Sequence, residues 1–350
     1  MNKLFYKTKP IIGLDFSRTG IRVVSADRMK KQIHGYGSIE LDPSKVLDDL
    51  EVSRSYLAQK VSELFTDNIV GKLESNRLAL SVPAVRTFAR TFSMPADQES
   101  HIKQAVDLEV EQYIPMPIEN LYVDHEIISR SKKDLTVLMC AVPRKLVDDL
   151  LDILNEAGLE VAAIEPSIYA VSRLLDMTRE GGMPTVIVDI GPGGTDIAVF
   201  DKAVRVTGGL TVGGNTLTLD IAKKMNLTVE NAHQLKVLSG LSPGPRQAKV
   251  TAALRQSLTR ITNETKKIIR FYIDRFPNEP KLEQLLIVGS GSNVPGIGEF
   301  FTNELVMPAR VASPWQSLEF TGTDQPSKHL RARLVTAAGL ALVNPGDTIQ

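Results

Sequence analysis

VIVDIGPGGTDIAVF, residues 186–200, is an apolar run that ends at Asp189, turns through three glycines and resumes as a second apolar run. IIGLDFSRTGIRVVSA, residues 11–26, has the same order in the first half of the chain, with Asp15 at the end of its first run. Both stretches predict a β-hairpin. Backbone N–H groups at such a turn can hold phosphate oxygens, and an aspartate beside the turn can hold a hydrated Mg²⁺. The pair therefore predicts a nucleoside triphosphate clamped between two lobes.

Each hairpin taken alone is also explained by an ordinary solvated turn, because Asp and Gly favour turns. The second hairpin is more specific, since Gly191, Gly193 and Gly194 crowd one turn beside Thr195 and Asp196. Glycines at those positions let backbone N–H groups approach a phosphate closely. The two hairpins together favour the nucleotide interpretation.

Length and composition limit the classes of protein to which this chain can belong. The chain has 350 residues, of which 43% are hydrophobic and 23% charged, and this predicts a soluble globular protein of two or more subdomains. The 41 basic and 41 acidic residues balance, which argues against a nucleic-acid binder. Cys140 is the one cysteine, so a disulfide framework is excluded and a reducing compartment is favoured. No apolar run of about 18 residues occurs, so we expect a cytoplasmic protein that does not span the membrane.

Other sequence patterns argue against a zinc site and a serine hydrolase and favour contact with adenosine. The five histidines lack zinc-ligand spacing, and no G-x-S-x-G elbow is present. The stretch LEQLLIVGSGSNVPGIGEFF, residues 282–301, predicts a strand, a glycine turn and a helix that begins near Asn293. Small residues at the turn suit contact with adenosine, although a glycine-rich turn is a weak signal by itself.

The periodicity of the remaining segments places an α/β module between the two hairpins. Residues 135–143 and 159–166 read as strands and residues 145–157 as a helix, within a module that spans about 84–165. A helical region follows at 228–276, with a Pro- and Gly-rich interruption at SGLSPGPRQ, and a last helix is expected at 331–343.

The order of these pieces resembles the actin-like ATPase superfamily, which has two phosphate loops and an adenosine motif. The run LEVEQYIPMPIENLYVDHEII, residues 108–128, resembles the PilM family of type IV pilus assembly proteins, which is related to FtsA. LVTAAGLAL, residues 334–342, is similar to the end of that family, where a glycine lets the last helix pack beneath the first phosphate loop. The resemblance covers residues 10 to 343.

The resemblance implies an α/β protein with the two-lobed actin-like (actin/DnaK/sugar-kinase) fold and an inserted α/β subdomain of the 1C type. The implied subdomains are 1A at residues 1–83, 166–183 and 330–350, 1C at 84–165, 2A at 184–222 and 281–329, and 2B at 223–280.

The resemblance also implies a site for ATP and Mg²⁺ between the lobes, with Asp15 and Asp189 binding the metal through water. The residues implied to contact the nucleotide are Asp15, Ser17, Arg18 and Thr19 in loop one, Gly191, Gly193, Gly194 and Thr195 in loop two, Gly213, Gly214, Asn215 and Lys236 near the sugar and phosphates, and Gly289, Ser290, Gly291, Ser292 and Asn293 at the adenosine.

Departures from the family pattern bear on hydrolysis. Ser17 stands where a glycine is usual, Pro192 removes a backbone N–H donor from loop two, and Gly194 replaces a hydroxyl residue. His233 stands where the family has a second acid near the ribose. Phosphate would be held, but not in the geometry of a fast ATPase. Glu165 either orients the attacking water or merely ends a strand before its proline, so slow hydrolysis and binding alone both stay open.

By resemblance, the protein is an adaptor that recruits the cytoplasmic N-terminal tail of a PilN-type membrane protein in a groove between the first core and the insertion. It would link the PilN–PilO platform to the pilus motor at the inner face of the cytoplasmic membrane, touching the membrane only through partners, and it could form homo-oligomers. One alternative is an FtsA-like filament-forming tether, which needs an amphipathic membrane helix where this sequence ends in GLALVNPGDTIQ. Another is a small-molecule kinase, which needs a catalytic aspartate beside a polar pocket.

Overall fold

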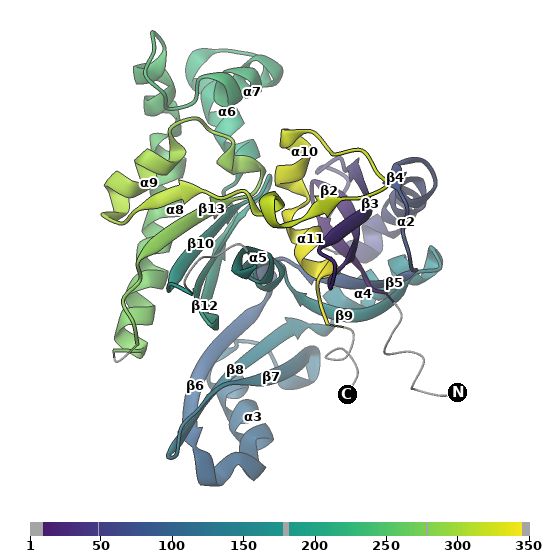
Figure 1. The fold of residues 1–350 in the computed structure, drawn as a ribbon, viewed down its shortest axis with the longest axis vertical. Coiled ribbons are helices and arrows are strands. Elements are labelled where there is room, and N and C mark those ends of the chain that lie inside the picture. Colours follow the sequence, from purple (N-terminus) through teal and green to yellow (C-terminus); the bar gives the residue numbers. More distant parts are fainter. Residues whose placement is uncertain (1–9, 48, 178–181, 278, 345–350) are drawn as a thin grey trace.

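The computed structural model describes residues 10–47, 49–177, 182–277 and 279–344 as two lobes with a smaller unit attached (Figure 1). The strands of the described residues form three sheets. The first sheet has the order β15 (Glu319–Phe320), β3 (Gln32–Glu40), β2 (Gly20–Asp27), β1 (Ile12–Ser17), β5 (Arg77–Val82) and β9 (Glu160–Pro166), with β4 (Ile69–Gly71) beside β3. The second has the order β12 (Ala203–Leu210), β11 (Thr195–Asp201), β10 (Thr185–Ile190), β13 (Gln284–Val288) and β14 (Ala309–Val311). The third has the order β6 (Phe88–Pro95), β8 (Asp134–Pro143) and β7 (Leu121–Arg130).

The helices divide between the same three units. Those of the first lobe are α2 (Leu50–Asp67), α4 (Arg144–Glu156), α5 (Ser167–Asp176), α10 (Lys328–Arg333) and α11 (Val335–Ala341). Those of the second lobe are α6 (Gly214–Met225), α7 (Val229–Leu238), α8 (Gln247–Arg275) and α9 (Ile297–Leu305), and the attached unit has α3 (Ile102–Tyr113). Short 3₁₀ turns include η1 (Ala84–Arg86) and η4 (Ser290–Ser292).

The two predicted hairpins occupy equivalent places in the two larger sheets. β1 pairs antiparallel with β2 and parallel with β5, and β10 pairs antiparallel with β11 and parallel with β13. The apolar runs form these central strands because both of their faces are covered, so that Ile12 and Val188, for example, are fully buried. The turns of both hairpins therefore lie at corresponding strand ends of the two sheets, and residues of both turns line one cavity.

The predicted insertion at residues 84–165 contains two structural parts. Residues 88–143 include all strands of the third sheet together with α3. By contrast, β9 pairs with β5 in the first sheet, and α4 packs against α2 through the buried Leu150 and Leu154. The predicted subdomain boundaries stay a prediction, and residues 1–9, 178–181 and 345–350 of predicted subdomain 1A lie outside the described residues.

Two predicted helices differ in extent from the structure. The helix expected near Asn293 begins only at Ile297, because Gly296 has a φ of 80° and this left-handed conformation interrupts an α-helix. The helix expected at 331–343 is divided into α10 and α11, which meet at Leu334 with a φ of −90° and a ψ of 0°.

Helices α5 and α11 lie between the two larger sheets (Figure 1). Their apolar side chains belong to one core cluster that also takes residues from β2 and β3 of the first sheet and from β10, β11 and β13 of the second. Every residue of α11 is buried. The helix lies directly on β1 because Gly13 leaves room for the carbonyl of Ala337 and the amide of Ala341. These two helices therefore pack against the sheets of both lobes.

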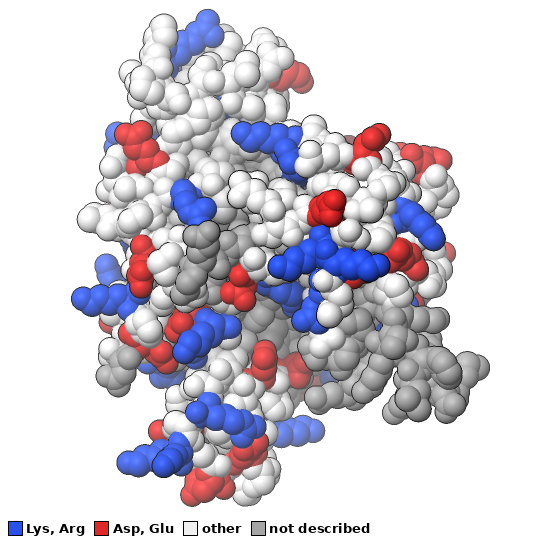
Figure 2. All heavy atoms as spheres, in the orientation of Figure 1, with Lys and Arg blue, Asp and Glu red and all other residues white. Residues whose placement is uncertain are grey.

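The surface agrees with the balanced composition. Figure 2 shows acidic and basic side chains interspersed on the displayed face. Among the described residues, no helix combines the length and the apolar character that crossing a membrane requires.

The contact between α11 and β1 is tested by Gly13→Ala. A methyl group at this position would overlap the backbone of α11, so we expect the free energy of unfolding to fall by more than ~2 kcal/mol, measured by urea denaturation. Gly244→Ala is the matched control, since no atom lies within 4 Å of a Cβ placed there. Equal stability of the two variants would contradict the close contact.

Candidate functional site

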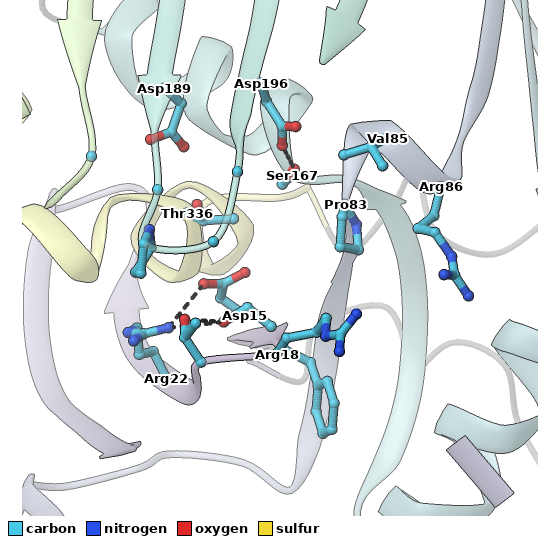
Figure 3. Close-up of a pocket in the computed structure, with 18 of the residues that line it drawn as sticks. Asp15, Arg18, Arg22, Pro83, Val85, Arg86, Ser167, Asp189, Asp196 and Thr336 are labelled. Carbon is cyan, nitrogen blue, oxygen red and sulfur yellow. Dashed lines mark hydrogen bonds and ion pairs between the residues drawn. The ribbon is translucent and has the colours of Figure 1, made fainter. Parts of the chain in front are cut away.

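A cavity of about 280 Å³ lies between the two lobes, where the hairpins face each other. Figure 3 shows Asp189 and Asp196 on neighbouring strands of one lobe, opposite Asp15 of the other lobe. Of the residues predicted to bind the nucleotide or metal, those that line the cavity are Asp15, Ser17, Arg18, Thr19, Asp189, Gly191, Gly193, Gly194, Gly289 and Ser290. The structure thus brings both predicted phosphate loops and both predicted metal-binding carboxylates to one cavity.

The carboxylate of Asp15 is held by groups on the two strands that flank β1. Ser81 of β5 donates a hydrogen bond of 2.7 Å to its Oδ1, and Nη1 of Arg22 lies 3.9 Å from its Oδ2. Arg22 is the cross-strand partner of Asp15 in the hairpin and also donates to Ser17 Oγ at 3.2 Å. Burial raises the pKa of Asp15, while Arg22 and Ser81 oppose this effect. The first hairpin therefore presents a partly neutralised carboxylate.

The second hairpin places an acid where the first has an arginine. Asp196 is the cross-strand partner of Asp189. Burial raises the pKa of Asp189 to about 8, and the negative charges of Asp196 and Asp15 add to the effect. Burial raises the pKa of Asp196 to about 6, although its carboxylate accepts hydrogen bonds from Ser167 Oγ and the backbone N–H of Ala84. This lobe therefore presents two carboxyl groups that are costly to ionise together.

This carboxyl cluster fits a hydrated divalent cation better than a metal bound by protein atoms alone. Among the residues that the structure describes, no group of three or more His, Cys, Asp and Glu side chains could hold a metal directly. Mg²⁺ usually keeps several waters and takes one or two carboxylates together with substrate phosphates. The raised pKa values of Asp189 and Asp196 show that ionising both carboxyl groups is costly, and such a cation would offset this cost.

The predicted residues around Gly213 lie behind loop two instead of lining the cavity. The backbone N–H groups of Gly214 and Asn215 donate to the carbonyls of Gly191 and Pro192, both at 2.9 Å. Lys236 is buried, and its Nζ donates to the carbonyl of Gly214 at 2.8 Å. Thr195 likewise lies outside the cavity lining, with its hydroxyl bonded to the carbonyl of Val212. In this structure these residues fix the shape of the phosphate loop.

The predicted adenosine turn reaches the cavity only at its start. Gly289 has a φ of 83°, and a Cβ at this position would overlap Oδ1 of Asp189, which explains why a glycine is required here. Beyond Ser290, Gly291 packs on Ile190 and Ser292 Oγ donates to the carbonyl of Gly289. Nδ2 of Asn293 is buried without a hydrogen-bond partner.

The position of Glu165 argues against the role in water activation that the sequence suggested. Its carboxylate forms two hydrogen bonds with Arg173, of 2.7 and 2.6 Å, and Arg173 also donates to the carbonyl of Gly339 on α11. Glu165 is absent from the cavity lining, whereas Ser167 and Asp196 belong to it. The ion pair joins β9, α5 and α11, which is a structural role.

The cavity continues beyond the phosphate loops as an apolar arm. This arm lies between the first core and the start of the inserted unit. Its residues come from β1, the loop before α2, the first residue of α2, η1 with the proline before it, and α4. Its apolar residues are Phe16, Val46, Leu47, Leu50, Pro83, Val85, Leu146 and Leu150. Leu47 and Val85 are 44% and 43% exposed, so the arm is open to solvent.

Sequence reasoning missed Arg22, Ser81, Ser167 and Asp196. A signal for two of them was present, because Arg22 and Asp196 each follow the hairpin aspartate by seven residues and therefore occupy the same place in the two turns. Ser81 and Ser167 come from other elements, and no local pattern marks them.

Comparisons with known proteins agree on one group of relatives. The sequence model of the family described as type IV pilus assembly protein PilM matches residues 13–344. Cell division protein FtsA of Neisseria meningitidis serogroup B is 24% identical over 254 residues, which is 65% of this chain and 58% of that protein. FtsA of Borreliella burgdorferi is 25% identical over 214 residues, 55% of this chain and 51% of that protein. The chain spans about half the length of these curated relatives.

Solved structures with the same fold extend over nearly the whole chain. The PilM–PilN type IV pilus biogenesis complex matches with a TM-score of 0.79 and 21% identity, covering 96% of this chain and 98% of that chain. MreB5 of Spiroplasma citri bound to ADP matches with a TM-score of 0.51 and 14% identity, covering 95% of each chain. At these identities the likeness shows the fold.

The raised pKa of Asp189 predicts a stability that depends on pH. The folded protein keeps this proton up to about pH 8, whereas the unfolded chain releases it near pH 4, so in EDTA stability falls as pH rises between these values. Asp189→Asn removes this cost. We expect it to exceed the wild type in free energy of unfolding by at least ~2 kcal/mol at pH 8, and to match it near pH 4, by urea denaturation. The same pH dependence in both proteins would contradict this.

Proposed function

We propose a function for this chain from the premise that it belongs to the PilM family of type IV pilus assembly proteins and has the actin-like ATPase fold. Type IV pilus assembly is accordingly the process in which it takes part. Our proposal is that the protein is an ATP-binding adaptor, which holds ATP and Mg²⁺ between its lobes and recruits the N-terminal tail of a PilN-type inner-membrane protein.

The proposed binding of a nucleotide rests on one observation: Asp15, Asp189 and Asp196 face each other across the cavity, beside loop two. Asp15 and Asp189 would bind the metal through water, and the metal would supply the positive charge that joins these carboxylates to the phosphates. The N–H groups of loop two would hold phosphate oxygens. The structure of MreB5 with the same fold is described as bound to ADP, which supports a nucleotide as the ligand of this chain.

ATP would act chiefly as a structural ligand that sets the angle between the lobes. Pro192 removes one donor from loop two, and Arg173 engages the carboxylate of Glu165. A site without a group to orient the attacking water binds nucleotide without rapid turnover. We therefore expect slow hydrolysis or none.

The apolar arm is the proposed site of the peptide. It lies between the first core and the inserted unit, and its open apolar residues suit a short apolar segment in an extended conformation. The solved relative described as a PilM–PilN complex supports PilN as the class of partner. By this contact the protein would be held at the cytoplasmic face of the inner membrane and reach PilO and the motor indirectly, as a monomer or a homo-oligomer.

The nucleotide part is tested by calorimetric titration with ATP, with and without Mg²⁺. We expect the wild type to bind ATP in the presence of Mg²⁺, and Asp189→Asn to lose the Mg²⁺-dependent affinity by at least about tenfold, because a carboxylate that holds the metal is gone. Asp134→Asn, which neutralises an exposed acid of β8, is the control. Unchanged affinity in Asp189→Asn would refute the clamp.

The peptide part is tested by titration with a synthetic PilN-type N-terminal peptide. Val85→Asp and Leu47→Asp place a charge in the apolar arm and should weaken peptide binding at least about tenfold, while ATP binding is retained. Val311→Asp is the matched control, since Val311 is 45% exposed on β14, in the other lobe. Peptide binding that survives both substitutions would exclude this groove.

A further inference from the structure

Two helices from opposite lobes face each other with basic side chains beside the cavity. α10 has the sequence KHLRAR, in which His329 and Arg333 are four residues apart and share a face. On α7, His233 and Lys236 are three residues apart and also share a face. These four residues are called the basic end below.

The members of the basic end are close together across the boundary between the lobes. The rings of His233 and His329 meet edge to face, with centroids 5.8 Å apart. Arg333 lines the cavity. Lys236 is 4% exposed, and its ammonium group, which has three donors, is bonded to two acceptors, the carbonyl of Gly214 and Oγ1 of Thr218. The basic end is therefore partly withdrawn from water, and it reaches the cavity lining at Arg333.

Little negative charge balances these groups. Among the described residues, Glu40 is the one acid that pairs with any of the four, and it is shared between Arg333 and Arg22. Burial, followed by neighbouring cations, lowers the pKa of His233 and His329 and lowers that of Lys236 to about 8.

Two donors at this end also lack acceptors. Nε of Arg333 and Nδ2 of Asn293 are both buried without a hydrogen-bond partner. A buried donor without an acceptor is costly, and neighbouring basic groups that share a single acid, Glu40, repel each other when they are protonated. Both facts indicate that an anion completes this end of the cavity.

We propose that the basic end binds a phosphate group carried at the 2′ or 3′ position of the ribose of a bound nucleotide. This inference rests on the proposed nucleotide site. With the 5′-phosphates at loop two and the base toward η4, the ribose lies beside α7 and α10. A carboxylate in such a place selects a free ribose hydroxyl, whereas basic side chains select a ribose phosphate. The protein would then respond to a ribose-phosphorylated nucleotide in preference to ATP.

The test is calorimetric titration of the full chain with ATP and with adenosine 5′-triphosphates that carry an additional phosphate at the ribose 2′ or 3′ position, all with Mg²⁺. We expect one of the two phosphorylated nucleotides to bind at least about tenfold more tightly than ATP, because it gains charge-assisted hydrogen bonds. Its advantage should shrink as salt increases and grow as pH falls from 8 to 6, since protonation of His233 and His329 adds positive charge.

Charge reversal at the basic end supplies the variants. His233→Glu and His329→Glu should each abolish the preference for the ribose phosphate while ATP still binds, and His101→Glu, at an exposed histidine of the inserted unit, should keep it. The two substitutions lie on different lobes, so that the test survives if one variant fails to fold. Thermal unfolding of each variant detects such a failure.

The possible failures are distinguishable. If ATP binds and neither ribose phosphate improves the affinity, the inference is wrong and the proposed function stands. If both glutamate variants still prefer the ribose-phosphorylated nucleotide to ATP, the ribose phosphate binds elsewhere, and the inference is also wrong. If no nucleotide binds, the proposed function fails together with the inference. Binding of a ribose-phosphorylated nucleotide without measurable binding of ATP would support the inference.

Discussion

Three partly buried carboxyl groups, Asp15, Asp189 and Asp196, face each other across the cavity between the lobes. In the first lobe, Asp15 lies opposite Arg22 on the neighbouring strand, and in the second lobe Asp189 lies opposite Asp196. The same turn thus carries a neutralising partner in one lobe and a second acid in the other. The second lobe therefore carries the two acids that are costly to ionise together, and a hydrated cation with phosphates would offset that cost.

The elements around the cavity hold these groups from both sides. Ser167, the first residue of α5, bonds to Asp196, so a helix of the first lobe reaches the carboxylate of the second. The same helix packs on α11, and their apolar side chains join the two sheets in one core cluster. A change in the charge state of the carboxyl cluster therefore acts on the contact that sets the relation of the lobes.

The proposed ligands would share walls of a continuous cavity. Phe16 and Arg18 belong to the hairpin that carries Asp15, and they line the cavity together with Val85 and Leu146 of the apolar arm. A peptide in the arm and a nucleotide at the loops would thus contact the same short segment. This arrangement would give the two proposed sites a physical route for coupling, if each ligand favoured the same conformation of the hairpin.

The two hairpins, the glycine turns and the alternation of strands and helices could be predicted from the sequence, because they depend on local periodicity and on residues with special backbone freedom. From these pieces, together with the family resemblance, the two-lobed fold and ten cavity-lining residues followed. Only the tertiary structure decided that Ser81 and Ser167 hold the carboxylates, that Arg173 engages Glu165, and that β9 belongs to the first sheet. These facts depend on contacts between residues far apart in the chain and on the loss of water around charged groups, which no local pattern records.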